Sequence, residues 1–302
     1  MAPAGRGNVN RILLLGNTGQ LGWELHRSLA ALGWVTALDQ PVLDLTRPEA
    51  LRELIRAQRP NLLVNATAYT AVDQAESEPE IARRINTDAP GVMAEEAHRL
   101  GAAFIHYSTD FVFNGQTDRP YTETDTPDPL SVYGLTKLDG EEAVRAAGGA
   151  YVILRTSWVY SLRRRSFTTQ VMEWARNRQI IRIASDQVGS PTWCRMLAET
   201  TALLIASLGG APLDSLGDHA GVYHLAGSGA ATRFEWAQLV LALDPRPEEH
   251  VVREVQPASE SEFPAPARRP RYSALDCERF QATFGLQLPD WKDALRLAMA
   301  EA

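Results

Sequence analysis

The chain is poor in cysteine and contains no long hydrophobic run. Only Cys194 and Cys277 occur among its 302 residues, and neither belongs to a C-x-x-C or C-x-x-H motif. This scarcity argues against a disulfide framework or a zinc site and is typical of incidental thiols in a reducing compartment. No apolar run reaches the roughly 18 residues that span a bilayer. Because the N-terminus lacks the apolar core of a signal peptide, we expect a flexible tail over residues 1–10 and a cytoplasmic protein.

Lysine is equally scarce, and positive charge is not in excess. Of the 30 basic residues only two are lysines, Lys137 and Lys292, and the net charge is -7. An acidic chain is a poor candidate for non-specific binding to nucleic acid, whose backbone attracts positive charge. Hydrophobic residues make up 45% of the sequence, which excludes an intrinsically disordered chain. A lysine retained against this bias toward arginine is a candidate for a specific role.

Short apolar runs alternate with amphipathic stretches over the first half of the chain. The runs predict buried strands, and the stretches between them predict helices. The predicted strands are residues 11–15, 34–39, 61–68, 102–109 and 151–160. The first predicted helix follows the first strand; it carries Leu21, Leu25, Leu29 and Leu32 and is capped by Gly33. The other predicted helices are residues 47–58, 79–100 and 132–147. This alternation predicts an α/β fold with a doubly wound parallel sheet.

The pattern changes after residue 160. The sequence there predicts helices at 166–178, 192–208 and 232–243, a short strand at 221–227, and a proline-rich loop at 245–270. Proline density of this kind is typical of a loop. We therefore expect a first domain over residues 11–161 and a smaller C-terminal α/β lobe over residues 162–302, partly interleaved with the first domain.

A glycine triplet follows the first predicted strand. Gly16, Gly19 and Gly22 stand in the segment GNTGQLG, between that strand and the first predicted helix. Glycines at this point allow a sharp turn, so that a pyrophosphate can approach the free N–H groups of the helix N-terminus. Asp39 ends the second predicted strand, 20 residues after Gly19, where a carboxylate can accept hydrogen bonds from a ribose. The segment predicts a Rossmann-type, NAD(P)-binding first domain.

A tyrosine and a lysine share one face of a later predicted helix. Tyr133 and Lys137 form Y-x-x-x-K, and residues four apart point to the same side. An ammonium beside a phenol lowers the phenol pKa and makes the phenol a better proton donor and acceptor near neutral pH. Ser108, Thr109 and Asp110 leave the carboxyl end of the fourth predicted strand, where ligands of doubly wound sheets bind. A hydroxyl there can hold a carbonyl oxygen beside the Tyr133 phenol.

These motifs together resemble the extended short-chain dehydrogenase/reductase family. Longer strings narrow the resemblance to the dTDP-4-dehydrorhamnose reductases, over nearly the whole chain: GNTGQLGWEL, VNATAYTAVDQAESEPE, HYSTDFVFNG, VYGLTKLDGE, LRTSWVY, SDQVGSPT and PARRPRYSALD. The resemblance implies that the protein transfers a hydride from NADPH or NADH to the C4 ketone of dTDP-4-dehydro-L-rhamnose, giving dTDP-L-rhamnose. It also implies that the second lobe binds the substrate.

The resemblance also implies individual roles. Tyr133 would donate the proton, Lys137 would hold the nicotinamide ribose and tune Tyr133, and Thr109 would hold the reacting oxygen. The implied cofactor contacts are Gly16, Gly19, Gln20, Leu21, Gly22, Asp39, Asp44, Leu45, Thr67, Ala68, Thr70, Tyr133 and Lys137. The implied substrate contacts are Thr109, Asp110, Trp158, Arg268 and Arg269, with the two arginines on a diphosphate.

Two segments depart from the pattern of these reductases. Arg163, Arg164 and Arg165 occupy a loop that is usually short and rich in glycine and asparagine; they would either reach a diphosphate or form a solvated charge run. Family members can bridge a dimer through carboxylates and magnesium, and Glu24 matches one such carboxylate, but Arg195 stands where another is expected. We therefore expect no metal ligands, no obligatory magnesium, and a monomer or weak homodimer.

Two other functions fit parts of the same pattern. One is a non-catalytic relative, such as the regulatory subunit of methionine adenosyltransferase, which shares this fold and acts by binding another protein. The other is a reductase or epimerase for a different nucleotide sugar. Retention of Thr109, Tyr133, Lys137 and Trp158 favours catalysis over the non-catalytic alternative.

Overall fold

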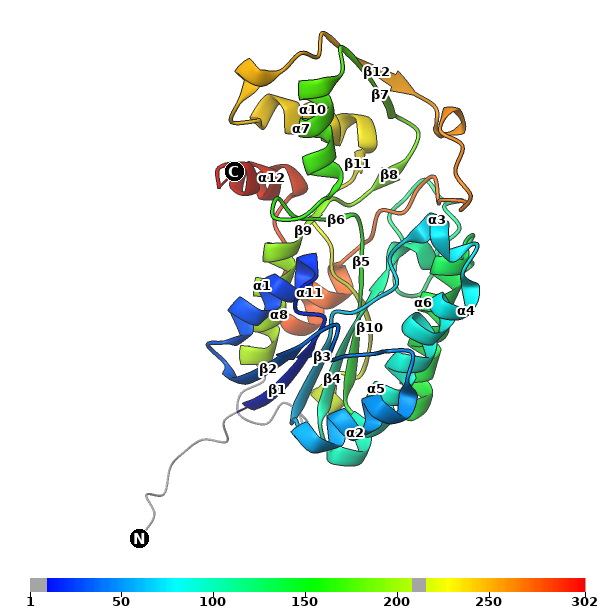
Figure 1. Ribbon diagram of the computed structural model, residues 1–302, viewed down its shortest axis with the longest axis vertical. Helices are drawn as coiled ribbons and strands as arrows, with labels where there is room; N and C mark the ends of the chain where they lie inside the picture. The colour runs from blue at the N-terminus through cyan, green and yellow to red at the C-terminus, as the bar shows by residue number, and fades with distance from the viewer. Residues whose placement is uncertain (1–9, 208–215, 302) are drawn as a thin grey trace.

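A six-stranded parallel sheet forms the centre of the protein. The computed structural model describes residues 10–207 and 216–301, and its main sheet has the strand order β10-β5-β4-β3-β1-β2 with every neighbouring pair parallel. The α/β fold with a doubly wound parallel sheet is thereby confirmed (Figure 1). Of the predicted tail, residues 1–9 lie outside the described residues, and Asn10 is the first residue of β1.

The elements follow one another closely along the chain. From the N-terminus to the fifth strand they are β1 (Asn10–Leu15), α1 (Gln20–Leu29), β2 (Gly33–Leu38), α2 (Pro48–Gln58), β3 (Leu62–Asn65), α3 (Val72–Ala75), α4 (Pro79–Arg83), η1 (Arg84–Asp88), α5 (Ala89–Leu100), β4 (Ala103–Thr109), η2 (Asp110–Val112), α6 (Val132–Ala147) and β5 (Tyr151–Thr156). Beyond them come β6 (Val159–Tyr160), α7 (Phe167–Asn177), β7 (Ile180–Ala184), β8 (Val188–Gly189), β9 (Thr192–Trp193), α8 (Cys194–Ser207), β10 (Gly221–His224), β11 (Ala231–Thr232), α10 (Arg233–Leu243), η3 (Pro247–Glu249), β12 (Glu254–Ala258), η4 (Glu260–Glu262), α11 (Glu278–Phe284) and α12 (Trp291–Met299).

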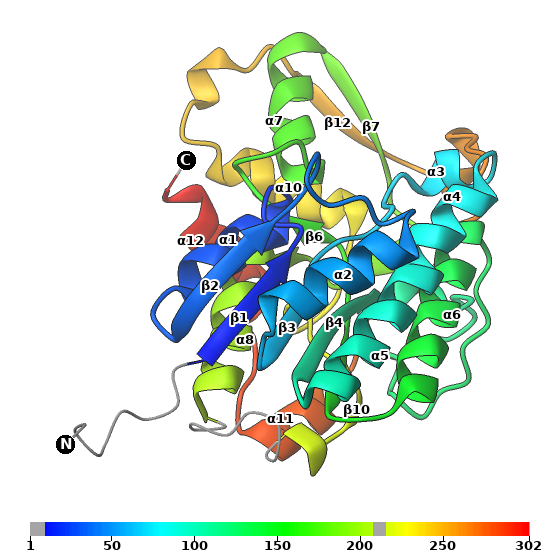
Figure 2. The ribbon, with the colours of Figure 1, turned by 60° about the horizontal axis from the view of Figure 1, so that its bottom comes forward.

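The continuous apolar strands are explained by burial on both faces of the sheet. Alternate residues of β1 belong to different cores: Leu14 packs with the leucines of α1 and α8, whereas Leu15 packs with residues of α2 and α5. Helices α1, α8 and α11 thus cover one face, and α2, α5 and α6 cover the other (Figure 2). No helix in the described ranges combines the length and apolar character needed to cross a membrane.

The main sheet draws on both halves of the chain. Its edge strand β10 pairs with β5, although residues 157–220 separate the two strands along the chain. Helix α8, also from the second half, packs beside α1 on the same face of the sheet. Consequently, no single cut in the chain separates the sheet from the rest of the protein.

A smaller lobe lies beyond the carboxyl ends of the main strands, at the top of Figure 1. It contains the parallel pair β7–β12, the antiparallel pair β8–β11, and helices α7, α10 and α12. Its own core centres on Trp236 and Trp291, which are 1% and 3% exposed. The lobe therefore has an apolar interior separate from the two layers beside the sheet.

Four sequence predictions of local structure were wrong in detail. Gly33 begins β2 instead of capping α1, which ends at Leu29. The helix predicted over 79–100 is divided by the π-helical turn η1. The strand predicted over 151–160 breaks where Trp158 takes a left-handed backbone conformation with φ of 44°. The proline-rich segment 245–270 is not all loop, because β12 lies within it.

Candidate active site

One large cavity lies between the carboxyl ends of β1, β3, β4 and β5 and the smaller lobe. Its volume is about 780 Å³, enough for a large ligand. It is lined by Gly19, Gln20, Leu21, Ala66, Thr67, Ala68, Thr70, Val72, Tyr107, Ser108, Thr109, Asp110, Phe111, Tyr133, Lys137, Thr156, Trp158, Val159, Arg164, Arg165, Phe167, Gln170, Arg233 and Trp236. Most residues predicted from the sequence are therefore brought together, and they come from both halves of the chain.

The glycine loop forms one end of this cavity. Gly16 has a φ of 91°, and a Cβ atom added there would lie 2.9 Å from the backbone of Ala66. A Cβ atom on Gly22 would lie 2.0 Å from the Gly16 carbonyl oxygen, so only glycine lets α1 start this close to the loop. Gly19 precedes α1 without a side-chain cap, which leaves N–H groups of the first turn available to an anion. The buried Oε1 of Gln20 accepts no hydrogen bond within the described residues, so it is available to a ligand hydroxyl or N–H group, whereas the free N–H groups fit a pyrophosphate.

Asp39 stabilises the glycine loop and does not line the cavity. Its Oδ2 accepts hydrogen bonds from the Thr18 backbone N–H at 3.0 Å and the Thr18 hydroxyl at 2.7 Å. Asp44 lies farther along, exposed, where hydrogen bonds from Thr46 lower its pKa. Leu45 packs against the core beneath α2 and α5. The structure thus places these three predicted adenosine contacts beyond the rim of the cavity.

Thr109, Tyr133 and Lys137 meet on one wall of the cavity. Thr109 ends β4, and its hydroxyl accepts the Phe111 N–H at 3.2 Å, which caps the short turn η2. Tyr133 lies in the first turn of α6, where burial raises the pKa of its phenol to about 12 and the neighbouring Thr109 hydroxyl opposes that shift. The lowered phenol pKa expected from the Tyr133–Lys137 spacing is therefore not found. Lys137 is only 2% exposed, and its Nζ donates to the Tyr107 carbonyl at 2.6 Å.

A buried ion pair fixes the helix that carries Tyr133 and Lys137. Glu141 of α6 is fully buried and accepts hydrogen bonds from Arg155 Nε at 2.9 Å and Arg155 Nη2 at 2.7 Å. The Ser108 hydroxyl donates to the same carboxylate at 2.5 Å. These bonds join α6 to β4 and β5 one turn beyond Lys137.

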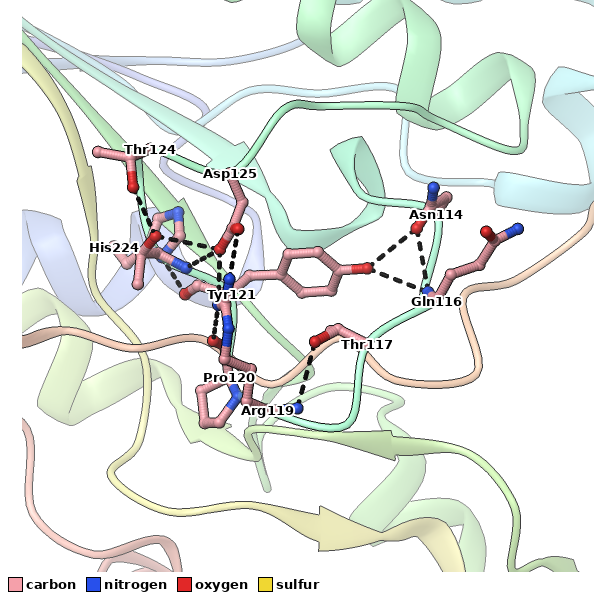
Figure 3. Close-up of polar contacts among 10 residues, drawn as sticks. Asn114, Gln116, Thr117, Arg119, Pro120, Tyr121, Thr124, Asp125 and His224 are labelled. Carbon is pink, nitrogen blue, oxygen red and sulfur yellow. Dashed lines mark hydrogen bonds and ion pairs between the residues drawn. The ribbon is translucent and has the colours of Figure 1, made fainter.

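The loop between η2 and α6 is held in place by its own polar contacts (Figure 3). The Tyr121 phenol donates to Asn114 Oδ1 at 3.0 Å and accepts from the Gln116 N–H at 3.1 Å. Its ring stacks on Phe113 with the centroids 4.1 Å apart. His224 of β10 donates through Nδ1 to the Tyr121 carbonyl at 3.0 Å, which anchors the loop to the edge of the sheet. The first half of the loop that leads to α6 is therefore fixed against the sheet.

Asp110 joins three separate segments beside the cavity. Its Oδ2 accepts hydrogen bonds from the Ser157 hydroxyl at 2.9 Å and the Ser273 hydroxyl at 2.5 Å. Burial raises the pKa of this carboxyl to about 6, although Ser273, Ser157 and Thr109 each oppose the shift. Asp110 therefore holds the end of β4, the turn after β5, and the C-terminal segment in one arrangement.

An aromatic cluster with an embedded arginine forms the other end of the cavity. Trp158 stacks against Trp236 with the ring centroids 5.7 Å apart, and the Arg233 guanidinium lies 3.6 Å above the Trp158 ring. Burial lowers the pKa of Arg233 to about 9, and the charge of Asp110 opposes that shift. In the part of the chain that the structure describes, no carboxylate forms an ion pair with Arg233. The sequence analysis missed Arg233, because only its tertiary stacking on Trp158 distinguishes it from other arginines.

The other candidate arginines occupy different positions. Arg164 and Arg165 line the cavity, whereas Arg163 stacks on the Trp23 ring at 3.8 Å and is exposed. Arg268 is exposed, and Arg269 forms an ion pair of 2.7 Å with Asp73. Arg269 and Arg233 both line an adjoining cavity of about 320 Å³. The structure thus brings Arg164, Arg165 and Arg233, and not Arg268 or Arg269, to the main cavity.

Glu24, which matches a carboxylate expected to bind magnesium in family members, forms ion pairs with arginines. Glu24 Oε2 lies 3.5 Å from Arg195 Nε and 3.3 Å from Arg27 Nη1, so both arginines form ion pairs with this carboxylate. Arg195 also forms an ion pair of 2.5 Å with Glu301. Among residues 10–207 and 216–301, no group of three or more His, Cys, Asp or Glu side chains is arranged to hold a metal ion.

The glycine loop at a strand end, the Thr–Tyr–Lys wall and the second lobe define an extended short-chain dehydrogenase/reductase, a class of oxidoreductases. Within this class, residues 10–302 match the family described as "RmlD substrate binding domain", and the chain belongs to that family. Sequence relatives agree with this assignment. The chain is similar to dTDP-4-dehydrorhamnose reductase of Escherichia coli K12, with 41% identity over 304 residues that cover 96% of this chain and 97% of the relative.

Two further comparisons extend the likeness. The dTDP-4-dehydrorhamnose reductase of Burkholderia thailandensis is 39% identical over 300 residues, covering 96% of this chain and 98% of the relative. The crystal structure of dTDP-4-dehydrorhamnose reductase from Bacillus anthracis in complex with NADP has a TM-score of 0.88 and 31% identity, covering 97% of this chain and 100% of that chain. The resemblance noted in the sequence is therefore confirmed over the full length.

The ribose contact that the sequence predicts for Asp39 can be tested through cofactor choice. Asp39→Ala removes a negative charge that would repel a 2′-phosphate, so the ratio of kcat/KM for NADPH to that for NADH should rise about fivefold to tenfold. The Thr18→Val variant is the matched control, because it removes one bond to Asp39 and keeps the charge. It should affect both cofactors equally. An unchanged ratio in Asp39→Ala would mean that Asp39 does not read the ribose.

The Glu24–Arg195 contact leads to a prediction about magnesium. Arginine is permanently positive and repels a dication, which prefers several oxygen ligands. Exhaustive EDTA treatment should therefore leave both turnover and mass in solution unchanged, as measured by cofactor oxidation and light scattering. Activity that is lost and returns only with magnesium, or a dimer that dissociates on chelation, would contradict this.

Proposed function

We propose that the protein reduces the C4 ketone of dTDP-4-dehydro-L-rhamnose to the alcohol of dTDP-L-rhamnose, using NADPH or NADH in the cytoplasm. The observation that carries this proposal is the convergence of Thr109, Tyr133 and Lys137 on the wall of one large cavity. The named relatives support the choice of sugar nucleotide. A binding protein without catalysis would not need this set of donors.

Different residues of the cavity would bind the cofactor and the sugar nucleotide. The glycine loop and the start of α1 would hold the pyrophosphate of the cofactor, with Thr67, Ala68 and Thr70 along its inner part. When bound, the nicotinamide supplies the hydride. Trp158 and Asp110, at the far end, would border the sugar. The reacting ketone then lies between the two lobes.

The chain itself supplies the proton. The Thr109 hydroxyl would hold the ketone oxygen beside the Tyr133 phenol, and Tyr133 would donate its proton as charge develops on that oxygen. The pKa of about 12 applies to the phenol without its ligands, so the proton is present on Tyr133 at neutral pH. Lys137 would hold the nicotinamide ribose and stabilise the phenolate that remains.

The diphosphate of the substrate is a partner for Arg233. Its guanidinium is half-buried, stacks on Trp158, and has five N–H donors suited to phosphate oxygens. Arg164 and Arg165 line the same cavity and add positive charge. Arg268 and Arg269, implied by the sequence resemblance, lie farther from the cavity, and Arg269 already has a carboxylate partner.

Turnover of the named substrate tests the proposal. The wild-type protein should oxidise NADPH or NADH when dTDP-4-dehydrorhamnose is supplied by the preceding epimerase. Tyr133→Phe should lower kcat by about 10²–10⁴-fold, because a positioned proton donor is lost, and should leave cofactor binding nearly intact. A Tyr133→Phe variant with near wild-type kcat would overturn the assignment of the proton donor. Cofactor binding without turnover of any nucleotide ketosugar would favour the non-catalytic alternative.

The role of Arg233 predicts a specific loss of substrate affinity. Arg233→Gln should raise the KM for the nucleotide sugar about 10–100-fold, since hydrogen bonds between charged groups are lost, with little change in the Kd of NADPH. Direct titration with dTDP should show the same loss. Arg268→Gln is the matched control, because Arg268 is exposed and does not line the cavity. If Arg268→Gln weakens binding of dTDP more than Arg233→Gln does, the diphosphate binds at Arg268 and not at Arg233.

A further inference from the structure

A buried polar chain lies behind Lys137 and reaches the cofactor side of the cavity. Asn65 ends β3, His106 lies in β4, and neither of the two is exposed. Asn65 Nδ2 is 3.0 Å from His106 Nδ1, and His106 Nε2 is 3.3 Å from Lys137 Nζ. Thr67, which lines the cavity, contacts Asn65 at the opposite end of the chain. The His106 imidazole therefore links Thr67, on the cofactor side of the cavity, to Lys137, on the wall that carries Thr109 and Tyr133.

The donor and acceptor of each hydrogen bond between Asn65, His106 and Lys137 follow from the groups that donate to Asn65. The Thr67 N–H and hydroxyl both donate to Asn65 Oδ1, at 3.0 Å and 2.5 Å. The Asn65 amide nitrogen therefore faces His106 Nδ1 and donates to it. Because a neutral imidazole has one donor and one acceptor nitrogen, Nδ1 accepts and the hydrogen of His106 lies on Nε2.

Burial and charge keep His106 neutral. Burial and the neighbouring Lys137 hold the pKa of His106 well below its usual value. The Nε2–H group then points at Lys137 Nζ, which can accept it only as an amine, since an ammonium has no lone pair. Burial also lowers the pKa of Lys137 to about 8, against the charge of Glu141, which is itself paired with Arg155. Tyr133 on the same helix and Tyr107 and Asp110 from the end of β4 are further titratable groups that line this part of the cavity.

We propose that His106 is a positioning residue for Lys137: its Nε2–H donates to Nζ and stabilises the amine that remains after Lys137 gives up a proton. This inference rests on the proposed function. Tyr133 gives its O–H proton to the product oxygen, and a Lys137 N–H proton then replaces it on the phenolate. The amine regains a proton from water. The ketone thus gains one hydride from the nicotinamide and, in net terms, one proton from solvent.

The first test measures the tautomer of His106 in the wild-type protein without cofactor or substrate. The chain has six histidines, so long-range ¹H–¹⁵N spectra of histidine-labelled protein are readily assigned, with His106→Phe identifying the signal. The proposal requires the Nε2–H tautomer. An Nδ1–H tautomer, or a charged imidazole at neutral pH, would overturn it. This measurement needs no substrate. Its outcome can therefore be told apart from a failure of the proposed reaction.

The second test uses the scarcity of lysine. With Lys137 and Lys292 as the only lysines, protein labelled with ¹³C at lysine Cε gives two titrating signals, and Lys292→Arg identifies them. His106→Phe keeps a ring beside Phe104 but removes the donor, so the pKa of Lys137 should rise by about 0.5–1 unit. A fall in that pKa would mean that His106 accepts from an ammonium, which contradicts the proposal.

Kinetics then separate a proton-handling role from a structural one. In His106→Phe the alkaline limb of the kcat profile should move upward with the pKa of Lys137, whereas KM for the nucleotide sugar should change little. His26→Phe, at an exposed position of α1, is the control and should move neither. A uniform loss of kcat at every pH, with an unmoved Lys137 titration, would assign His106 a packing role only and overturn the proposal.

Discussion

The geometry of the reaction depends on one buried ion pair. Glu141 and Arg155 form two hydrogen bonds between α6 and β5, and Ser108 joins β4 to the same carboxylate. Since Glu141 lies one turn beyond Lys137, this contact sets both the height and the rotation of the catalytic helix. Loss of one partner from such a pair typically costs about 3–5 kcal/mol, because the other charge remains buried. Stability and catalytic alignment therefore rest on the same atoms.

Around this fixed helix the two ends of the cavity differ in character. The cofactor end is built from backbone, where glycines bring N–H groups close to a pyrophosphate. The sugar end is built from side chains of several segments, with Asp110 joining Ser157 to Ser273 and Arg233 stacked on Trp158. A backbone site recognises a feature common to all dinucleotides, whereas a side-chain site can change its ligand by substitution. Specificity for the sugar nucleotide therefore resides at the second end.

Local patterns predicted the parts of the fold that depend on local physics. Apolar runs buried on both faces predicted the strands, and the helical spacing of Tyr133 and Lys137 predicted a shared face, which the cavity wall confirms. Contacts made only in three dimensions were not predictable. Arg233 acquires its environment from the Trp158 turn, and His106 resembles a core residue of its strand until Asn65 and Lys137 are brought beside it. The cofactor roles of Asp39 and its neighbours remain predictions.

The pairing of β10 with β5 has a consequence for synthesis of the chain. Until residue 224 has left the ribosome, β5 is an open edge whose backbone N–H and C=O groups have no partner on that side. About three quarters of the protein can thus be complete while its main sheet still offers a template for pairing with another nascent chain. Because Ser273 completes the contacts of Asp110, the substrate end forms later still. A fragment made of the first half alone should therefore be prone to aggregation despite its complete glycine loop.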